Sequence, residues 1–132
     1  MTIETFNPDT MAAPGGHYSH AAAGGGLVFV AGQLPIDASG RKLSDAPFEA
    51  QATQVLANLQ TALVAAGSDK QRLLQVRVYV TDIAHWPAFN SLYAAWLGSH
   101  RPARAVVPVP LLHFGFLIEV EAVALCPAPD RP

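Results

Sequence analysis

The sequence has few charged residues, a single cysteine and no long apolar run, and each shortage excludes a class of protein. The lone thiol, Cys126, cannot form an intrachain disulfide, and residues 1–4 lack the basic start of a signal peptide. No apolar stretch approaches the ~18 residues that cross a bilayer. The eight Lys and Arg are scattered, which leaves no basic stripe for nucleic acid. We therefore expect a cytoplasmic protein that binds neither membrane nor nucleic acid.

Apolar residues are what the chain has in excess. They make up 51% of the sequence against 14% charged residues, which predicts more apolar surface than a small monomer usually exposes. The length of 132 residues is that of one compact domain, so we expect residues 1–132 to form a single domain. The surplus of apolar surface predicts an oligomer.

Two segments carry the apolar spacing of amphipathic helices. In residues 48–66 an apolar side chain recurs every three or four positions, with polar residues such as Asn58 between them. Gly67 follows where a helix commonly ends in a left-handed residue. A second helix is predicted over residues 85–97, where an aromatic and leucine stripe is followed by Gly98.

Four segments carry strand patterns. Residues 27–31 form a short apolar run between glycines, and residues 74–81 alternate strictly between apolar and polar side chains. Residues 103–109 and 117–125 are the other candidates, and the prolines around position 108 indicate an edge strand or a bulge. With a further strand expected before the first helix, the predicted order is strand, strand, helix, strand, helix, strand, strand. This is an α+β fold with both helices on one sheet face.

Three charged residues on the predicted strands are candidates for chemistry. Glu119 and Glu121 share one face of the last strand, either on a solvated surface or opposite a partner. Arg104 is the candidate partner, because it lies in an otherwise apolar strand and its forked guanidinium suits carboxylates. If buried, Arg104 needs either a protein carboxylate or an anionic ligand, and otherwise it forms a surface salt bridge. The spacing of the residues alone does not distinguish a protein carboxylate, an anionic ligand and a surface salt bridge as the partner of Arg104.

Other potential motifs favour ordinary structural roles. His17 and His20 form an H-x-x-H pair, but a glycine-rich loop offers no helical register and the sequence supplies no evident third metal ligand. Cys126 has no neighbouring base to activate it. Gly32 and the glycines at 24–26 do not have the spacing of a phosphate-binding loop. We predict neither a metal site nor a cofactor.

The chain resembles the reactive-intermediate deaminases, also called the RidA, YjgF or endoribonuclease L-PSP family. The similarity spans nearly the whole sequence. It is carried by GHYSH at 16–20, LVFVAGQLPID at 27–37, AAG at 65–67, VYVTD at 78–82, FNSLY at 89–93, RPAR at 101–104 and IEVEA at 118–122.

This resemblance implies a chorismate-mutase-like α+β fold, with a mixed sheet, two helices on one face and a homotrimeric assembly. Three pockets would lie between neighbouring subunits. The implied activity is hydrolysis of reactive enamines and imines, such as 2-aminoacrylate and 2-iminopropanoate, to a 2-keto acid and ammonia. Neither a metal nor an organic cofactor takes part.

The resemblance also implies roles for individual residues. Arg104 would clamp the substrate carboxylate, and Glu119 would polarise the attacking water as the general base. Tyr18 would shape the pocket or donate a hydrogen bond. Asn90 corresponds to a polar residue of the second helix, and Gly32 begins the Gly-Gln pair that borders the pocket.

The chain departs from the family pattern at pocket positions. Ala31 stands where the well-known deaminase branch commonly has serine, and Val106 stands where that branch often has cysteine. The sequence PLLH at 110–113 replaces an Arg-Leu-Pro element. These replacements make the pocket more apolar, which predicts either a different or bulkier imino acid or binding without efficient turnover.

Three other functions compete with imine deamination. The chain could be a non-catalytic trimer that binds small carboxylates or other metabolites, or a deaminase of 2-aminomuconate-like compounds. The ribonuclease activity in the family name is the least favoured, because the sequence offers neither a basic surface nor the paired histidines of a metal-free nuclease.

Overall fold

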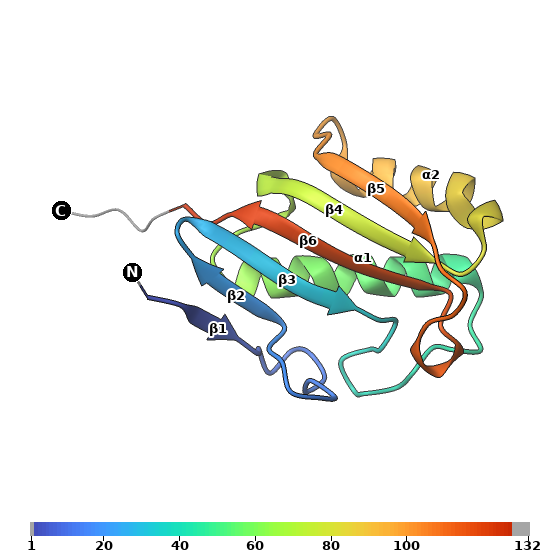
Figure 1. The fold of residues 1–132 in the computed structure, drawn as a ribbon, viewed down its shortest axis with the longest axis horizontal. Helices are drawn as coiled ribbons and strands as arrows, with labels where there is room; N and C mark the ends of the chain where they lie inside the picture. The colour runs from blue at the N-terminus through green and yellow to red at the C-terminus, as the bar shows by residue number, and fades with distance from the viewer. Residues whose placement is uncertain (1, 128–132) are drawn as a thin grey trace.

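The structure is a computed structural model, and it describes residues 2–127. Its strands form one six-stranded sheet in the order β1-β2-β3-β6-β4-β5 (Figure 1). Neighbouring strands are antiparallel except for the parallel pair β4–β5, so the sheet is mixed. The strands are β1 Glu4–Phe6, β2 Ala21–Gly24, β3 Leu27–Gln33, β4 Leu73–Val80, β5 Ala103–Pro108 and β6 Ile118–Leu125. The proline-bearing β5 lies at an edge, as predicted.

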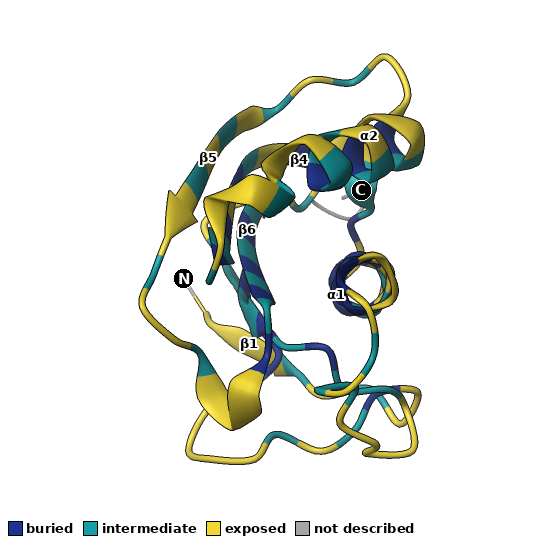
Figure 2. Cartoon of the chain, turned by 90° about the vertical axis from the view of Figure 1, so that its right-hand side faces the viewer, coloured by how far each residue is buried: buried dark blue, intermediate teal, exposed yellow. Residues whose placement is uncertain are grey.

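Two helices pack on the same face of this sheet (Figure 2). Helix α1 spans Phe48–Ala65 and helix α2 spans Trp86–Leu97. Short 3-10 helices, Lys70–Arg72, Ile83–His85 and His113–Gly115, lie in the connections. The predicted α+β fold, with both helices on one face, is therefore confirmed.

The core lies between the sheet and the helices. Val76, Val78 and Val80 are fully buried, while the residues between them face the other side of the sheet. The same alternation buries Ile118 and Val120 of β6 against the helices. Burying each such side chain contributes about 1.5–3 kcal/mol.

The structure has one more strand before the first helix than the sequence predicted. β1 is only three residues long, and β2 has the sequence AAAG, which carries little intrinsic strand propensity. Gly25 and Gly26 both have positive φ, of 61° and 83°, and form a tight hairpin turn. This turn pairs β2 with β3, so the strand results from its partner and not from its own side chains.

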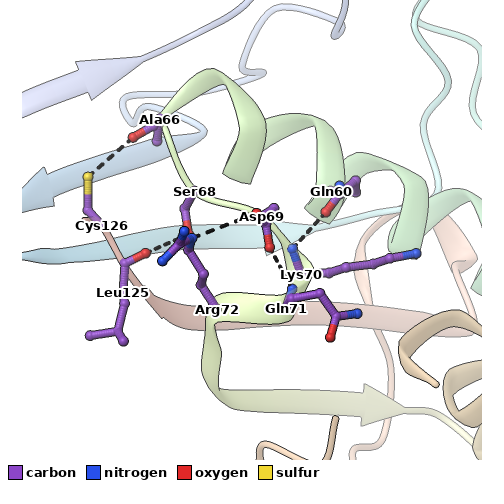
Figure 3. Close-up of polar contacts among 9 residues, drawn as sticks. All are labelled: Gln60, Ala66, Ser68, Asp69, Lys70, Gln71, Arg72, Leu125 and Cys126. Atoms are coloured by element: carbon purple, nitrogen blue, oxygen red, sulfur yellow. Dashed lines mark hydrogen bonds and ion pairs between the residues drawn. The ribbon is translucent and has the colours of Figure 1, made fainter. Parts of the chain in front are cut away.

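Hydrogen bonds join the connection between α1 and β4 to the end of β6 and to α1 (Figure 3). The Ser68 hydroxyl donates to the Leu125 carbonyl at 2.6 Å, and the Lys70 N–H donates to the Gln60 side chain at 3.0 Å. The Cys126 thiol donates to the Ala66 carbonyl at 3.4 Å. Cys126 therefore takes part in the packing at this end of the sheet.

The sheet face opposite the helices carries apolar side chains that the chain itself leaves uncovered. Phe29 is 50% exposed, Val107 37% and Leu125 46%. They lie on three different strands, β3, β5 and β6. A face of this kind fits the expectation of an oligomer.

Candidate functional site

A cavity of about 420 Å³ lies at the end of the sheet where β3 finishes and β6 begins. Three segments build it: the loop before β2, the end of β3 with its following loop, and the β5–β6 connection (Figure 1). Its lining is mostly apolar, and it consists of Gly15, Gly16, Tyr18, Ala31, Gly32, Leu34, Ile36, His113, Phe114 and Glu119. Four of these residues, Tyr18, Ala31, Gly32 and Glu119, are ones that the sequence predicted for the site.

Glu119 is the one carboxylate among these lining residues. Burial raises the pKa of its side chain, the nearby His113 opposes that effect, and the negative charge of Glu121 adds to it. The strand opposite Glu119 is irregular, because the β3–β6 register shifts between Val30 and Gln33. Within that bulge, a methyl group on Gly32 would overlap the Glu119 carboxylate, so a larger residue there would displace that side chain.

Two buried amide side chains of α1 hold the walls of the cavity. The Asn58 amide donates to the carbonyls of Leu34 and Ile36, at 3.1 and 3.0 Å. Gln51 accepts a 2.9 Å hydrogen bond from the Leu117 N–H, which follows the β5–β6 loop. In the sequence, Asn58 is one of the polar positions of the predicted helix, and no role was predicted for Gln51. Their spacing with the buried Val55 does put both on the apolar stripe, which is the signal that could have identified them.

His20 ties the N-terminal loop to β3 beneath the cavity. Its Nε2 lies 2.7 Å from the Ala12 carbonyl, and the Gln33 amide donates to its Nδ1 at 3.2 Å. Because Nδ1 accepts, Nε2 carries the proton and donates to Ala12. The Tyr18 ring lies edge-on to this imidazole at 6.1 Å. Both nitrogens of His20 thus serve the packing of the loop that presents Tyr18.

A second cavity, of about 480 Å³ and more polar than the first, lies between α2 and β5 and contains Arg104. The Arg104 guanidinium donates to the Asn90 side-chain oxygen at 2.9 Å and lies 5.3 and 5.1 Å from the rings of Trp86 and Tyr93. The Tyr93 hydroxyl is buried without a hydrogen-bond partner within residues 2–127. Burial raises the pKa of Tyr93 to about 12, although the Arg104 charge opposes this. Within the same residues, the two ion pairs are Arg72–Asp69 and Arg77–Glu121, so Arg104 has no carboxylate partner.

Arg104 and Glu119 lie on opposite faces of the sheet. Arg104 is in register with Val76, whose side chain faces the helices, whereas Glu119 is in register with Tyr79 on the other face. The expectation that Arg104 pairs with the glutamates was therefore wrong within one chain. Glu121 instead contacts Arg77 at 3.2 Å and the Tyr79 hydroxyl at 3.1 Å.

The remaining predicted residues divide between the two locations. Asn90 contacts Arg104, and Val106 lies two residues beyond Arg104 and packs against the hydrophobic core. Sequence reasoning gave no site role to Tyr93, which it assigned to the packing stripe of the second helix. The sequence leaves open whether His113 reaches the site, because no spacing rule connects the β5–β6 loop with Glu119.

Together, the mixed sheet and its one-sided helices define a small α+β protein with a mostly apolar cavity at its strand ends. Residues 9–126 match the model of a protein family described as Endoribonuclease L-PSP. Protein HMF1 of Saccharomyces cerevisiae is 35% identical over 125 residues, which is 92% of this chain and 96% of HMF1. The chain belongs to this family, which includes the RidA and YjgF proteins.

The chain is also similar to a protein of known crystal structure and to a mitochondrial protein. The crystal structure of RidA from an Antarctic Psychrobacter matches with a TM-score of 0.87 and 32% identity, over 92% of this chain and 98% of RidA. The mitochondrial protein mmf1 of Schizosaccharomyces pombe is 35% identical over 113 residues, covering 83% of this chain and 68% of mmf1. In the part of the chain that the structure describes, no helix is both long and apolar enough to span a bilayer. No group of three potential metal ligands occurs within that part either.

Proposed function

We propose that this protein hydrolyses reactive imines and enamines of amino acids to 2-keto acids and ammonia. The observation that carries the proposal is Glu119, a half-buried carboxylate with a raised pKa in a small, mostly apolar cavity. A general base works best when its pKa lies close to the working pH, and burial moves Glu119 in that direction. The Arg104 guanidinium has no carboxylate partner among the described residues 2–127, and it supplies a receptor for the carboxylate of the substrate.

In this reaction Glu119 takes a proton from water while the water oxygen bonds to the imine carbon. The imine nitrogen takes up a proton in the same step, which gives a carbinolamine. The proton held by Glu119 then passes to the amine, which leaves as ammonia, while the hydroxyl loses its proton and becomes the carbonyl of the keto acid. Arg104 fixes the substrate carboxylate and thereby places the imine carbon beside the water, which removes much of the entropic barrier.

The reaction needs the side chains of two subunits, because Arg104 and Glu119 of one chain lie on opposite sheet faces. We infer a homotrimer in which Glu119 meets Arg104 of the partner subunit. The uncovered Phe29 and Val107 support this arrangement, since an oligomer interface would bury them. A cytosolic location is part of the same proposal, and it rests on the single cysteine.

The cavity walls favour a substrate with an apolar side chain. Leu34, Ile36 and Phe114 line the cavity around Glu119, and Ala31 contributes a methyl group instead of a hydroxyl. Each methylene of the substrate side chain that these walls bury contributes about 0.8 kcal/mol to binding. A second candidate, a trimer that binds metabolites without turnover, is favoured by the missing hydroxyl at Ala31.

The test is to generate imino acids of increasing side-chain size with an amino-acid oxidase. A reagent that captures the imine, and not the keto acid, then measures how much imine remains. We expect the protein to accelerate hydrolysis, and to accelerate it more for the leucine- or phenylalanine-derived imine than for 2-iminopropanoate. A preference for the smallest imine would contradict the size argument. Ligand binding without acceleration of any imine would favour the non-catalytic trimer.

A further inference from the structure

His113 lines the same cavity as Glu119, from the middle of the β5–β6 connection. The loop that carries it has a defined conformation. Phe114 adopts φ 57°, a costly left-handed backbone for a bulky residue, and Gly115 follows with φ 72°. Two anchors hold this conformation: Phe116 is buried, and the Leu117 N–H is bonded to Gln51 of α1. The fold therefore sets the backbone position of His113, whose side chain is exposed.

The charged and titratable groups around His113 come from three segments. Glu119 of β6 faces it across the cavity, and the positive charge of His113 lowers the pKa of that carboxyl against the effect of burial. Tyr18 faces it from the N-terminal loop, and Glu121 lies further along β6. The Lys42 ammonium lies 4.7 Å from the centre of the neighbouring Phe114 ring and borders an adjoining cavity.

Imine hydrolysis needs an acid as well as a base. While Glu119 accepts a proton from water, the imine nitrogen gains electrons and must receive a proton from a different group. An imidazolium suits this role because it gains and loses its proton near neutral pH. Phenols as a class are much weaker acids than imidazolium, which disfavours Tyr18, and Lys42 is held over the Phe114 ring.

We propose that His113 is the proton donor to the substrate nitrogen, opposite Glu119. This inference rests on the proposed deaminase function. In the first step the C–O bond forms, Glu119 takes the proton of water and His113 gives its proton to nitrogen, which yields a neutral carbinolamine. In the second step protonated Glu119 gives its proton to the amine as the C–N bond breaks. His113 recovers a proton from the hydroxyl that becomes the carbonyl, and ammonia leaves.

The first test compares pH profiles of kcat/KM for the wild type, His113→Gln and the control His17→Gln, whose side chain is exposed in the N-terminal loop. The wild type should show an acid limb from Glu119 and an alkaline limb from the group that donates a proton to the substrate nitrogen. His113→Gln should lower the rate by about 10²-fold and remove the alkaline limb, since general acid catalysis is of this size. His17→Gln should keep both limbs.

A second test does not depend on activity. Carbon-detected NMR of the Glu119 carboxyl should show a higher pKa in His113→Gln than in the wild type, and no change in His17→Gln. If the wild type accelerates imine hydrolysis and His113→Gln has the same kcat/KM and the same pH profile, this inference is overturned while the proposed function stands. An unchanged Glu119 titration in His113→Gln would also overturn this inference. Absence of wild-type acceleration with any imine would overturn the proposed function, and the inference with it.

Discussion

Arg104→Ala is expected to reduce kcat/KM for imine hydrolysis by about 10²–10³-fold, because it removes two charge-assisted hydrogen bonds to the substrate carboxylate. Arg104 has no carboxylate partner within residues 2–127, so its charge is free for a ligand. Its loss should change stability little, since the side chain is only partly buried and its hydrogen-bond partner in the chain is Asn90. Steady-state kinetics beside a thermal unfolding curve separates the two effects.

Two matched variants make this result specific. Arg104→Lys keeps the charge but not the fork, and we expect an intermediate loss, mainly in KM. Arg101→Ala removes a second arginine that borders the same cavity, and it should leave kcat/KM within a few-fold of the wild type. Near-normal activity of Arg104→Ala would rule out Arg104 as the carboxylate clamp.

Glu119→Gln is expected to abolish turnover and, at neutral pH, to stabilise the fold. Burial raises the pKa of Glu119, which means that the folded protein pays a cost to hold the ionised carboxylate. Such a group contributes stability below its unfolded pKa and loses that contribution as pH rises through the folded pKa. The neutral amide avoids the cost, so the gain of Glu119→Gln should be present at neutral pH and vanish in acid. Urea unfolding at several pH values measures this.

The same raised pKa predicts the acid limb of activity. Only the carboxylate can accept a proton, so kcat/KM should begin to fall at a pH above that expected for an ordinary glutamate. Glu121→Gln is the matched control, two residues along the same strand and face, where the side chain binds Arg77 and Tyr79. Retention of activity in Glu119→Gln would contradict the role of general base.

Local patterns were enough to predict the elements that form the core. The three-to-four spacing of residues 48–66 and the alternation of residues 74–81 each encode a face, and the structure buries that face. The prolines near position 108 marked β5 as an edge because proline cannot donate to a neighbouring strand.

Features that depend on pairing between distant segments could not be predicted in the same way. β2 forms because the Gly25-Gly26 turn brings it to β3. The opposite orientation of Arg104 and Glu119 depends on the register of β5 and β6 against β4, and a shift of one residue would reverse either. The approach of His113 to Glu119 depends on a left-handed residue, Phe114, that no propensity favours.

The central claim is that one subunit supplies Glu119 and the partner subunit supplies Arg104. Mixing inactive Arg104→Ala and Glu119→Gln subunits, after joint refolding at equal amounts, tests it directly. In a random trimer about a quarter of the pockets would combine an intact Glu119 with an intact Arg104, so activity should return to about a quarter of the wild-type level. A mixture as inactive as its two components would contradict the shared pocket.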